Sequence, residues 1–484
     1  LVLHCISKVK SEIGEPGERR TGNQELDKIF PELYEAYEKK LLQSNAFDFD
    51  DLIEKPVRAF LKHQSVLQKY REQFQYILVD EFQDINTAQY EFIRLLGEKS
   101  RNISVVGDDQ QSIYSFRGSD FRNFLNFEKD WPGTKVVLLE ENYRSTGNII
   151  SSASAVIANN KIQKVKNLWT KNAVGEPVTV VEHADERAEA SWIADVIFKI
   201  AKATKESGEI SREPAVAVLY RTNAQSRELE QALIERHIAY EIFGGVRFYD
   251  RKEIKDIVSC LRYAVNPKDA VSLERISENF LKKPSGELIH NLPGKPDILN
   301  PVELTHYILK TADYLNYLKR NFPNAEERIE NITELITFAS SYKNTRDFLE
   351  KITLLQGNEM PSGRSKRGVK SSVKRADSMA HLMTIHSAKG LEFNTVIVAG
   401  CVEGLLPHGK AYKNNGKVDG IEEERRLMYV AMTRAQQQLF LSFYGLGSRF
   451  LYEIPPELIQ FTSFVSDYHD MEFSSDEERY IIFP

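Results

Sequence analysis

Short apolar stretches alternate with segments of helical spacing in two sets along this chain, and this alternation constrains the fold more than any other feature. One set lies at about 72–158, and the other lies at about 178–243 and resumes at 382–443. The expected strands are Tyr76–Val79, Ile103–Val106, Val136–Leu139, Val178–Val181, Val216–Tyr220, Tyr240–Phe243, Leu382–Ile385, Val396–Val398 and Leu439–Phe443. Strands that alternate with helices form parallel sheets covered on both faces. The sequence therefore predicts an α/β fold with two such domains.

The length of 484 residues suits about three domains at roughly 150 residues each. Residues 1–63 and about 266–360 carry helical rather than strand patterning, so they divide the α/β segments. We expect the following parts: a helical lead-in at 1–63, the first α/β domain at 64–160, the second at 161–265 and 376–450, an inserted helical subdomain with a basic linker at 266–375, and a C-terminal tail at 451–484.

The basic linker at the end of the insertion, residues 361–375, contains six cations and no acid. Its glycines and serines are typical of a flexible connection. Two interpretations remain open for it, a solvated loop and an arm that follows phosphates. The cations are Arg364, Lys366, Arg367, Lys370, Lys374 and Arg375.

Composition excludes some classes of protein. Hydrophobic content of 42% and charged content of 28% are ordinary for soluble proteins, and no apolar run approaches the roughly 18 residues of a membrane span. The three cysteines, Cys5, Cys260 and Cys401, are too scattered for a disulfide framework, which favours a cytoplasmic location. A net charge of −6 does not argue against nucleic acid, because a local groove can bind it whatever the total charge.

Two carboxylates end the first expected strand. Asp80 and Glu81 follow an apolar run, and a buried strand would fix both while its tip opens to a ligand. In such a pair the first acid can hold Mg²⁺ and the second can polarise an attacking water. A strand that simply ends at solvent is the plainer interpretation. Gln83 and Asp84 continue the polar cluster, however, and the next strand ends in a loop of acids, amides and aromatics at 107–118, so a nucleotide site is favoured.

The phosphate loop that such an acid pair needs, G-x-x-x-x-G-K-[ST], does not occur in the sequence. The Gly-Lys pairs are Gly294-Lys295, Gly409-Lys410 and Gly416-Lys417, and none is followed by Ser or Thr. The chain begins with Leu1 in mid-pattern. We therefore expect a fragment, and we expect the chain alone to be inactive in ATP hydrolysis.

Six motif-length stretches support a family resemblance. They are Val79–Asp84, Gly107–Gly118, Glu141–Thr146, Tyr220–Arg227, Thr384–Phe393 and Glu423–Ala435. In this order they resemble the UvrD/PcrA/Rep group of superfamily 1 DNA helicases, and the resemblance runs from about residue 44 to about 459. It implies two RecA-like motor domains with ATP between them and inserted helical subdomains. The first motor domain would be incomplete in this chain.

The resemblance also implies roles for residues at the nucleotide. Asp80 would hold Mg²⁺, Glu81 would activate water, Gln111 would sense the γ-phosphate, Tyr143 would stack on adenine, Arg144 would contact the γ-phosphate, Glu392 would reach the nucleotide, and Arg434 would be an arginine finger. An arginine delivered across a closing cleft accelerates phosphoryl transfer by roughly 10³ to 10⁵. Lys389 matches no phosphate-loop pattern and stays unassigned.

The same resemblance indicates a path for single-stranded DNA. Tyr114, Phe116 and Arg117 form the expected stacking set, and many relatives carry Trp where this chain has Phe116. A phenyl ring still offers a face for bases. Arg221 and Asn223 match the strand-contacting loop. For His386 two interpretations stay open, a satisfied buried histidine and a DNA or coupling contact.

The expected function is that of an ATP-dependent DNA helicase or translocase that moves 3′ to 5′ in DNA repair or replication. Its partners would be single-stranded DNA and single/double-strand junctions, although the insertion shows no clear duplex-contacting hairpins. Two alternatives remain. A degenerate, non-hydrolysing nucleic-acid-binding or regulatory module would not need the acids and arginines, and the motor part of a helicase-nuclease would need a nuclease constellation that the tail after Phe461 does not show.

Overall fold

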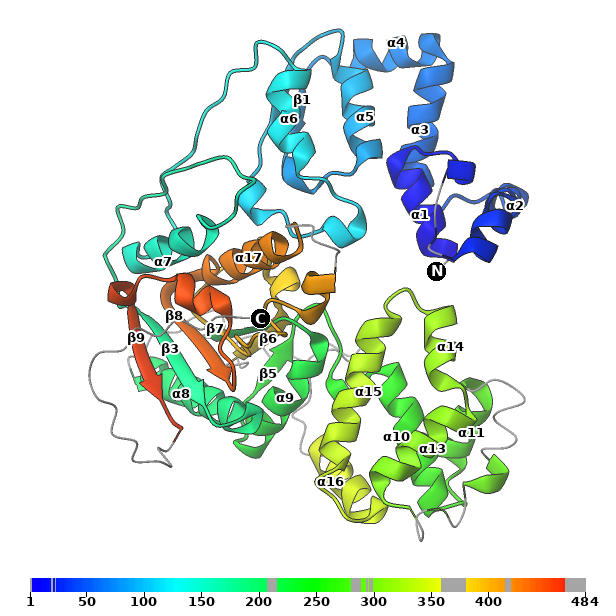
Figure 1. Cartoon of the computed structure of the whole chain (residues 1–484), viewed down its shortest axis with the longest axis vertical. Helices are drawn as coiled ribbons and strands as arrows, with labels where there is room; N and C mark the ends of the chain where they lie inside the picture. The colour runs from blue at the N-terminus through cyan, green and yellow to red at the C-terminus, as the bar shows by residue number, and fades with distance from the viewer. Residues whose placement is uncertain are drawn as a thin grey trace.

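The computed structural model describes residues 2–18, 21, 23–206, 216–279, 289–292, 295, 299–357, 380–413 and 419–465. Figure 1 shows a blue-to-cyan body, a sheet with helices on both faces, and a separate group of helices beside that sheet. The helices are α1 (Val2–Glu12), α2 (Gln24–Gln43), α3 (Asp51–Lys62), α4 (Gln64–Gln73), α5 (Thr87–Gly97), α6 (Arg122–Asp130), α7 (Gly147–Ile157), α8 (Glu186–Glu206), α9 (Ser226–Glu235), α10 (Lys252–Val265), α11 (Ala270–Asn279), α13 (Pro301–Thr311), α14 (Tyr314–Asn321), α15 (Ala325–Ala339), α16 (Thr345–Gly357) and α17 (Asp419–Met432).

A seven-stranded parallel sheet forms the larger α/β unit. Its spatial order is β5-β6-β4-β7-β8-β3-β9, and every pairing is parallel. The strands are β3 (Val178–His183), β4 (Val216–Tyr220), β5 (Tyr240–Ile242), β6 (Ala380–Thr384), β7 (Phe393–Val398), β8 (Ala435–Tyr444) and β9 (Ile459–Ser463). β4 is central and buried along its whole length, as its unbroken apolar sequence predicts. The predicted α/β fold is confirmed.

Helices cover both faces of this sheet. α7 and α17 pack on one face through one core cluster, and α8 and α9 pack on the other through a second cluster. α7 therefore packs with the second sheet, although its residues precede the domain limit that we expected at 160.

A two-stranded parallel sheet forms the smaller α/β unit. β1 (Ile77–Val79) pairs with β2 (Ile103–Val105), with Ile77 opposite Ile103. α6 covers one side through Phe127 and Trp131, which pack with Phe82. α3, α4 and α5 form an adjoining cluster around Phe60. The strand pair thus holds the end of β1 beside the end of β2.

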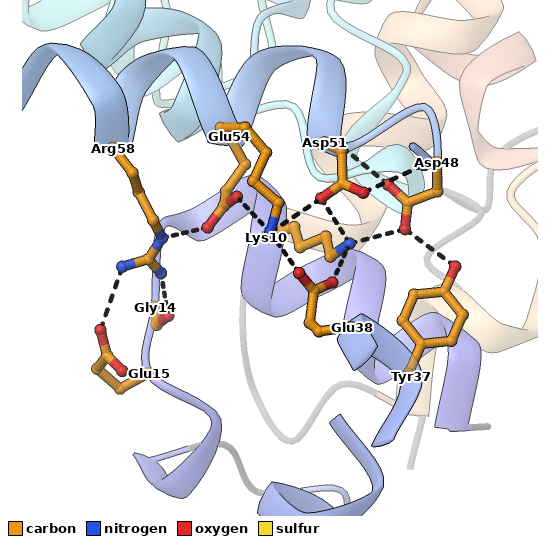
Figure 2. Close-up of polar contacts among 10 residues, drawn as sticks. Lys10, Gly14, Glu15, Tyr37, Glu38, Asp48, Asp51, Glu54 and Arg58 are labelled. Carbon is orange, nitrogen blue, oxygen red and sulfur yellow. Dashed lines mark hydrogen bonds and ion pairs between the residues drawn. The ribbon is translucent and has the colours of Figure 1, made fainter. Parts of the chain in front are cut away.

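A buried lysine ties the helical lead-in together (Figure 2). Lys10 on α1 is fully buried, and its Nζ lies 2.6 Å from Glu38, 2.8 Å from Asp48 and 2.8 Å from Asp51. Burial alone would lower the pKa of Lys10, but hydrogen bonds with these three carboxylates raise it above its ordinary value. Because the acids come from α2, from the loop before α3 and from α3, one ammonium group fixes three segments against α1.

The inserted helices α10 to α16 form their own core beside the large sheet (Figure 1). Their fully buried residues include Ile254, Ile308 and Leu335. Within this core, Tyr314 donates to Asp256 at 2.7 Å. The helical character expected at 266–360 is confirmed in the described part, and the group begins earlier, at α10.

Two local expectations differ from the structure. Val136–Leu139 forms no strand, and these residues are exposed. β9, which the sequence analysis did not predict, adds an edge strand beside β3. The basic linker 361–375 lies outside the described residues, as does the tail beyond 465. In the part of the chain that the structure describes, no helix combines the length and apolarity needed to cross a membrane.

Candidate functional site

The acid pair lies where the strand ends of the small sheet meet. Asp80 and Glu81 follow β1 directly, and Glu81 has a left-handed backbone with a φ of 50°. The buried side-chain amide of Gln83 donates to Oε2 of Glu81 at 2.6 Å. Its carbonyl oxygen accepts from the main-chain N–H of Asp108, after β2, at 2.9 Å. Gln83 therefore joins the two strand ends and orients Glu81.

A lysine from the large sheet reaches into this acid cluster. Lys389, which follows β6, has a nearly buried side chain; its Nζ donates to Asp84 and to the main-chain carbonyl of Gln111, the latter at 2.8 Å. The same Nζ lies 3.7 Å from Oε2 of Glu81. Burial raises the pKa of the Asp84 carboxyl, and the bond from Lys389 opposes that rise. Lys389 therefore compensates a carboxylate of the other unit.

Two arginines meet at the same boundary. Arg434 lies between α17 and β8 and is 2% exposed; it donates to Oε1 of Gln111 at 3.3 Å and to the main-chain carbonyl of Leu391 at 3.2 Å. Arg144 donates to Glu392 at 2.7 Å and to the carbonyl of Thr433 at 3.2 Å. The structure thus brings together Gln111, Arg144, Glu392 and Arg434, as expected of residues that share a ligand.

The electrostatics of this group suit an anion. The pKa of Arg434 is lowered to about 10, mainly by burial and also by the nearby positive charge of Arg144. The hydrogen bond from Arg144 lowers the pKa of the Glu392 carboxyl. Two guanidinium groups that are close enough to repel each other are stabilised when a polyanion lies between them. Beside them, Tyr143 is 79% exposed, so its ring is open to a planar partner.

The acid cluster fits Mg²⁺ only in part. The described residues contain no group of three or more His, Cys, Asp or Glu side chains that could hold a metal ion. Mg²⁺ at phosphoryl-transfer sites is bound by one or two carboxylates together with substrate phosphates, however. Asp80 and Glu81 supply that number of acids. The donor set is thus suitable for a metal that arrives with a phosphate ligand.

An aromatic cluster lies across the same boundary. The rings of Tyr114 and Phe116 are 6.0 Å apart, and the ring of His386 lies 5.4 Å from Phe116 in an edge-to-face arrangement. The hydroxyl of Tyr114 donates to the main-chain carbonyl of His386 at 3.1 Å. Phe116 remains 58% exposed. Lys389 lies 5.3 Å from the centre of the Tyr114 ring, so one side chain links the aromatic cluster to the acid cluster.

Comparisons with known proteins identify the family. Residues 2–132 match the UvrD/REP helicase N-terminal domain, and residues 137–313 and 300–445 match the UvrD-like helicase C-terminal domain. The chain is 36% identical to the ATP-dependent DNA helicase PcrA of Bacillus subtilis (strain 168) over 514 residues, which cover 95% of this chain and 68% of that protein. The chain belongs to the UvrD-like helicases. Similar proteins include the PcrA helicases of Leuconostoc citreum, 35% identical over 95% of this chain and 68% of that protein, and of Staphylococcus aureus (strain MRSA252), 35% identical over 95% and 69%.

Two of the remaining expected DNA contacts of this UvrD-like helicase, Arg221 and Asn223, lie just after β4. Arg221 forms a two-pronged ion pair with Glu424 on α17, with distances of 2.8 to 3.2 Å. Asn223 begins a short 3-10 turn, Asn223–Gln225, before α9. The side chain of Arg117 lies outside the described residues. The guanidinium of Arg221 is therefore held by a carboxylate in this state of the helicase.

Sequence reasoning missed the residues that join the two units. Lys389 stood unassigned, and the contact of Ser115 with Glu423, whose Oγ to Oε1 distance is 2.6 Å, was not foreseen. The available signal for Lys389 was its place just after an expected strand of the second sheet, because the ends of parallel strands meet at one edge. Its partners belong to another sheet, so no spacing within the sequence could name them.

Proposed function

We propose that this UvrD-like helicase acts in ATP-dependent DNA unwinding or translocation, moves 3′ to 5′ and serves DNA repair or replication. The observation that carries the proposal is the contact of Arg434 with Gln111 across the boundary between the two sheets, with Arg144 beside Arg434. Its similarity to proteins named ATP-dependent DNA helicase PcrA supports the activity. Opening and closing of this boundary would couple a nucleotide to motion.

The nucleotide is ATP with Mg²⁺. In this proposal Asp80 holds the metal, Glu81 orients water, and Gln111 detects the γ-phosphate. Tyr143 stacks on adenine, which its exposed ring supports, and Arg144 and Arg434 neutralise phosphate charge with Glu392 beside them. Bound Mg²⁺ would supply charge that stabilises the phosphoryl group during transfer. The protein's own part is to hold the two arginines where negative charge develops.

The 484 residues alone do not turn over ATP, because their sequence contains no phosphate loop. Lys389 also occupies the acid cluster, where it bonds Asp84. Hydrolysis requires a protein in which a phosphate loop completes the site. DNA-dependent ATP turnover by the 484-residue chain that disappears in Glu81→Gln would contradict this statement.

Single-stranded DNA is the nucleic-acid partner, and single/double-strand junctions are its natural context. Tyr114, Phe116 and His386 support this partner, because clustered aromatic rings with one face open stack on bases. Asn223 and Arg221 extend the track along the end of β4. A cytoplasmic location is consistent with three buried, unpaired cysteines.

The test compares single-stranded and duplex DNA binding by anisotropy and follows translocation of a protein that also carries a phosphate loop. We expect preferential single-strand binding and ATP-dependent movement toward the 5′ end. Binding without any nucleotide-dependent movement in that protein would favour a non-hydrolysing nucleic-acid-binding module. Movement toward the 3′ end would contradict the proposed direction alone.

A further inference from the structure

We propose that Arg251 is a positioning residue for the DNA-facing turn that begins at Asn223. Arg251 holds this turn in its binding conformation through its own hydrogen bonds to Asn223 and Ser226. The inference rests on the proposed function, because it gives a support to a residue expected to contact single-stranded DNA. Arg251 follows the 3-10 turn Phe248–Asp250 and directly precedes α10, so it lies where the chain leaves the sheet for the insertion.

The guanidinium of Arg251 joins three parts of the chain. The residue is 6% exposed. Its Nη1 donates to the main-chain carbonyl of Asn223 at 2.8 Å and to Oδ1 of Asn331 on α15 at 2.8 Å. Its Nη2 donates to Oγ of Ser226, the first residue of α9, at 2.8 Å. A planar guanidinium can satisfy acceptors in several directions at once, and a lysine ammonium has no such fixed fork.

The buried charge of Arg251 has a buried counterpart. Oγ of Ser226 donates to Oε1 of Glu230 at 2.7 Å, and Glu230 is 3% exposed. The ring of Phe248 lies 5.2 Å from the Arg251 guanidinium. A cation in such surroundings is tolerated only while its donors are used. Because the buried guanidinium needs this acceptor, the bond from Arg251 to the carbonyl of Asn223 is expected to persist as long as the contacts among Arg251, Ser226 and Glu230 are intact.

The network continues into the inserted helices. The side-chain N–H of Asn331 donates to Oε1 of Glu253 on α10 at 2.7 Å, and Arg328 donates to the same carboxylate group. On the other side of the turn, Arg227 donates to Glu334 on α15 at 2.6 Å. α15 thus bonds Arg251, which holds the Asn223–Ser226 segment, and Arg227, which follows it.

Among Arg227, Arg251 and Asn331, Arg251 is the residue whose side chain bonds the main chain of Asn223, the expected DNA contact. Asn331 bonds Glu253 on α10 and Arg251, the residue just before α10. Neither partner belongs to the turn that begins at Asn223. Removing Asn331 loosens the insertion and leaves the bond from Arg251 to Asn223 in place. The two residues therefore separate a role in attaching the helices from a role in positioning the turn.

The experiment measures the affinity of the full 484-residue chain and its variants for a fluorescent oligothymidylate. Amide hydrogen exchange of residues 222–226 is followed in the same samples without DNA. The variants are Arg251→Met, Arg251→Lys and the matched control Asn331→Ala. We expect Arg251→Met to weaken binding roughly ten-fold, as the loss of a charged hydrogen bond does, and to speed exchange in the turn. Arg251→Lys should be intermediate, and Asn331→Ala should stay within about two-fold of the unaltered chain.

The outcomes separate a role of Arg251 in positioning the turn from a role in attaching the inserted helices. A folded Arg251→Met variant with unchanged affinity and unchanged exchange overturns the positioning role. An equal loss of affinity in Asn331→Ala also overturns it, because Arg251 would then only attach the insertion. Failure of the unaltered chain to bind oligothymidylate contradicts the proposed function, and the exchange measurement still decides whether Arg251 orders the turn. If Arg251→Met does not fold, the same comparison is made with Arg251→Lys.

Discussion

The ammonium of Lys389 donates a hydrogen bond of 2.8 Å to the main-chain carbonyl of Gln111, although 278 positions separate the two residues. Lys389 belongs to the large sheet, and Gln111 follows the last strand of the small sheet. The same ammonium bonds Asp84 and approaches the Tyr114 ring. One side chain thus touches the acid cluster, the expected phosphate sensor and the aromatic cluster. The contacts that we propose for nucleotide and for DNA therefore meet at the boundary between the sheets.

Removal of that ammonium should destabilise the chain. We expect Lys389→Met to lower the free energy of unfolding by about 3 kcal/mol at neutral pH, because Asp84 loses its nearly buried partner. The pKa of Asp84 is already raised by burial, and loss of Lys389 raises it more. A group whose pKa is raised in the folded state stabilises the fold below its unfolded pKa, and this contribution is lost as pH rises. The difference in unfolding free energy between the unaltered chain and Lys389→Met should therefore shrink in acid. Urea unfolding at several pH values measures it.

Two controls accompany Lys389→Met. The exposed Lys171 pairs with Glu141 at 2.8 Å, so Lys171→Met should leave stability nearly unchanged because solvent screens this pair. Adding Asp84→Asn to Lys389→Met should recover part of the loss, because the uncompensated carboxylate is gone. A double variant that is no more stable than Lys389→Met would refute this explanation.

A buried glutamate should make stability fall as pH rises. Burial raises the pKa of Glu189 to about 7, although hydrogen bonds from the Gly400 N–H and the Ser442 hydroxyl oppose that rise. Its contribution is complete below the unfolded pKa near 4.5 and disappears as pH passes about 7. We expect Glu189→Gln to flatten the decline between pH 5 and pH 8 by roughly 2–3 kcal/mol. Chemical unfolding across that range measures the slope, with Glu235→Gln on α9 as the control. An unchanged slope in Glu189→Gln would contradict the assignment.

The lysine of Figure 2 should be necessary for the helical lead-in. We expect Lys10→Met to cost about 3–5 kcal/mol, because Glu38, Asp48 and Asp51 keep their charges without the cation between them. Thermal unfolding and hydrogen exchange in α1 and α3 measure the effect. Lys8→Met on the same helix is the matched control, because the side chain of Lys8 is 40% exposed and its Nζ lies 3.7 Å from Oε1 of Glu12.

The pH dependence of the Lys10 network has the opposite sign to that of Glu189. Burial alone would raise the pKa of Asp48, but the hydrogen bonds from Lys10, the Asp51 N–H and Tyr37 lower it. A group with a lowered folded pKa stabilises above its unfolded pKa and loses that contribution as pH falls through the folded value. The gap between the unaltered chain and Lys10→Met should therefore narrow in strong acid. A constant gap would show that Lys10 acts by packing alone.

Strand patterning predicted most of the two sheets. Runs such as Val216–Tyr220 are apolar throughout because both faces of a central parallel strand are buried, and this pattern is specific. Val136–Leu139 has the same pattern, yet the structure shows no strand there, because a strand also needs a hydrogen-bonded neighbour. β9 was missed for the reverse reason. Its sequence, Ile-Gln-Phe-Thr-Ser, mixes polar and apolar residues as an edge strand does.

The sequence predicted the site residues that belong to a recognisable motif. It did not predict the residues whose importance comes from contacts with a segment distant in sequence. Gln111, Arg144, Glu392 and Arg434 were expected from motif resemblance, and the structure brings them together. The partners of Lys389 and of Arg251 lie on segments distant in sequence. Such contacts depend on how sheets and inserted helices pack, which no local spacing records.

We propose that this chain carries a single-stranded DNA track built on Tyr114, Phe116 and His386. The most direct measurement is the affinity of the chain for oligothymidylate with Phe116→Ala and Phe116→Trp as variants. Loss of one stacking ring should cost about 1–3 kcal/mol of binding free energy, and Trp should bind at least as well as Phe because its face is larger. Equal affinity of the unaltered chain and Phe116→Ala for oligothymidylate would contradict the claim.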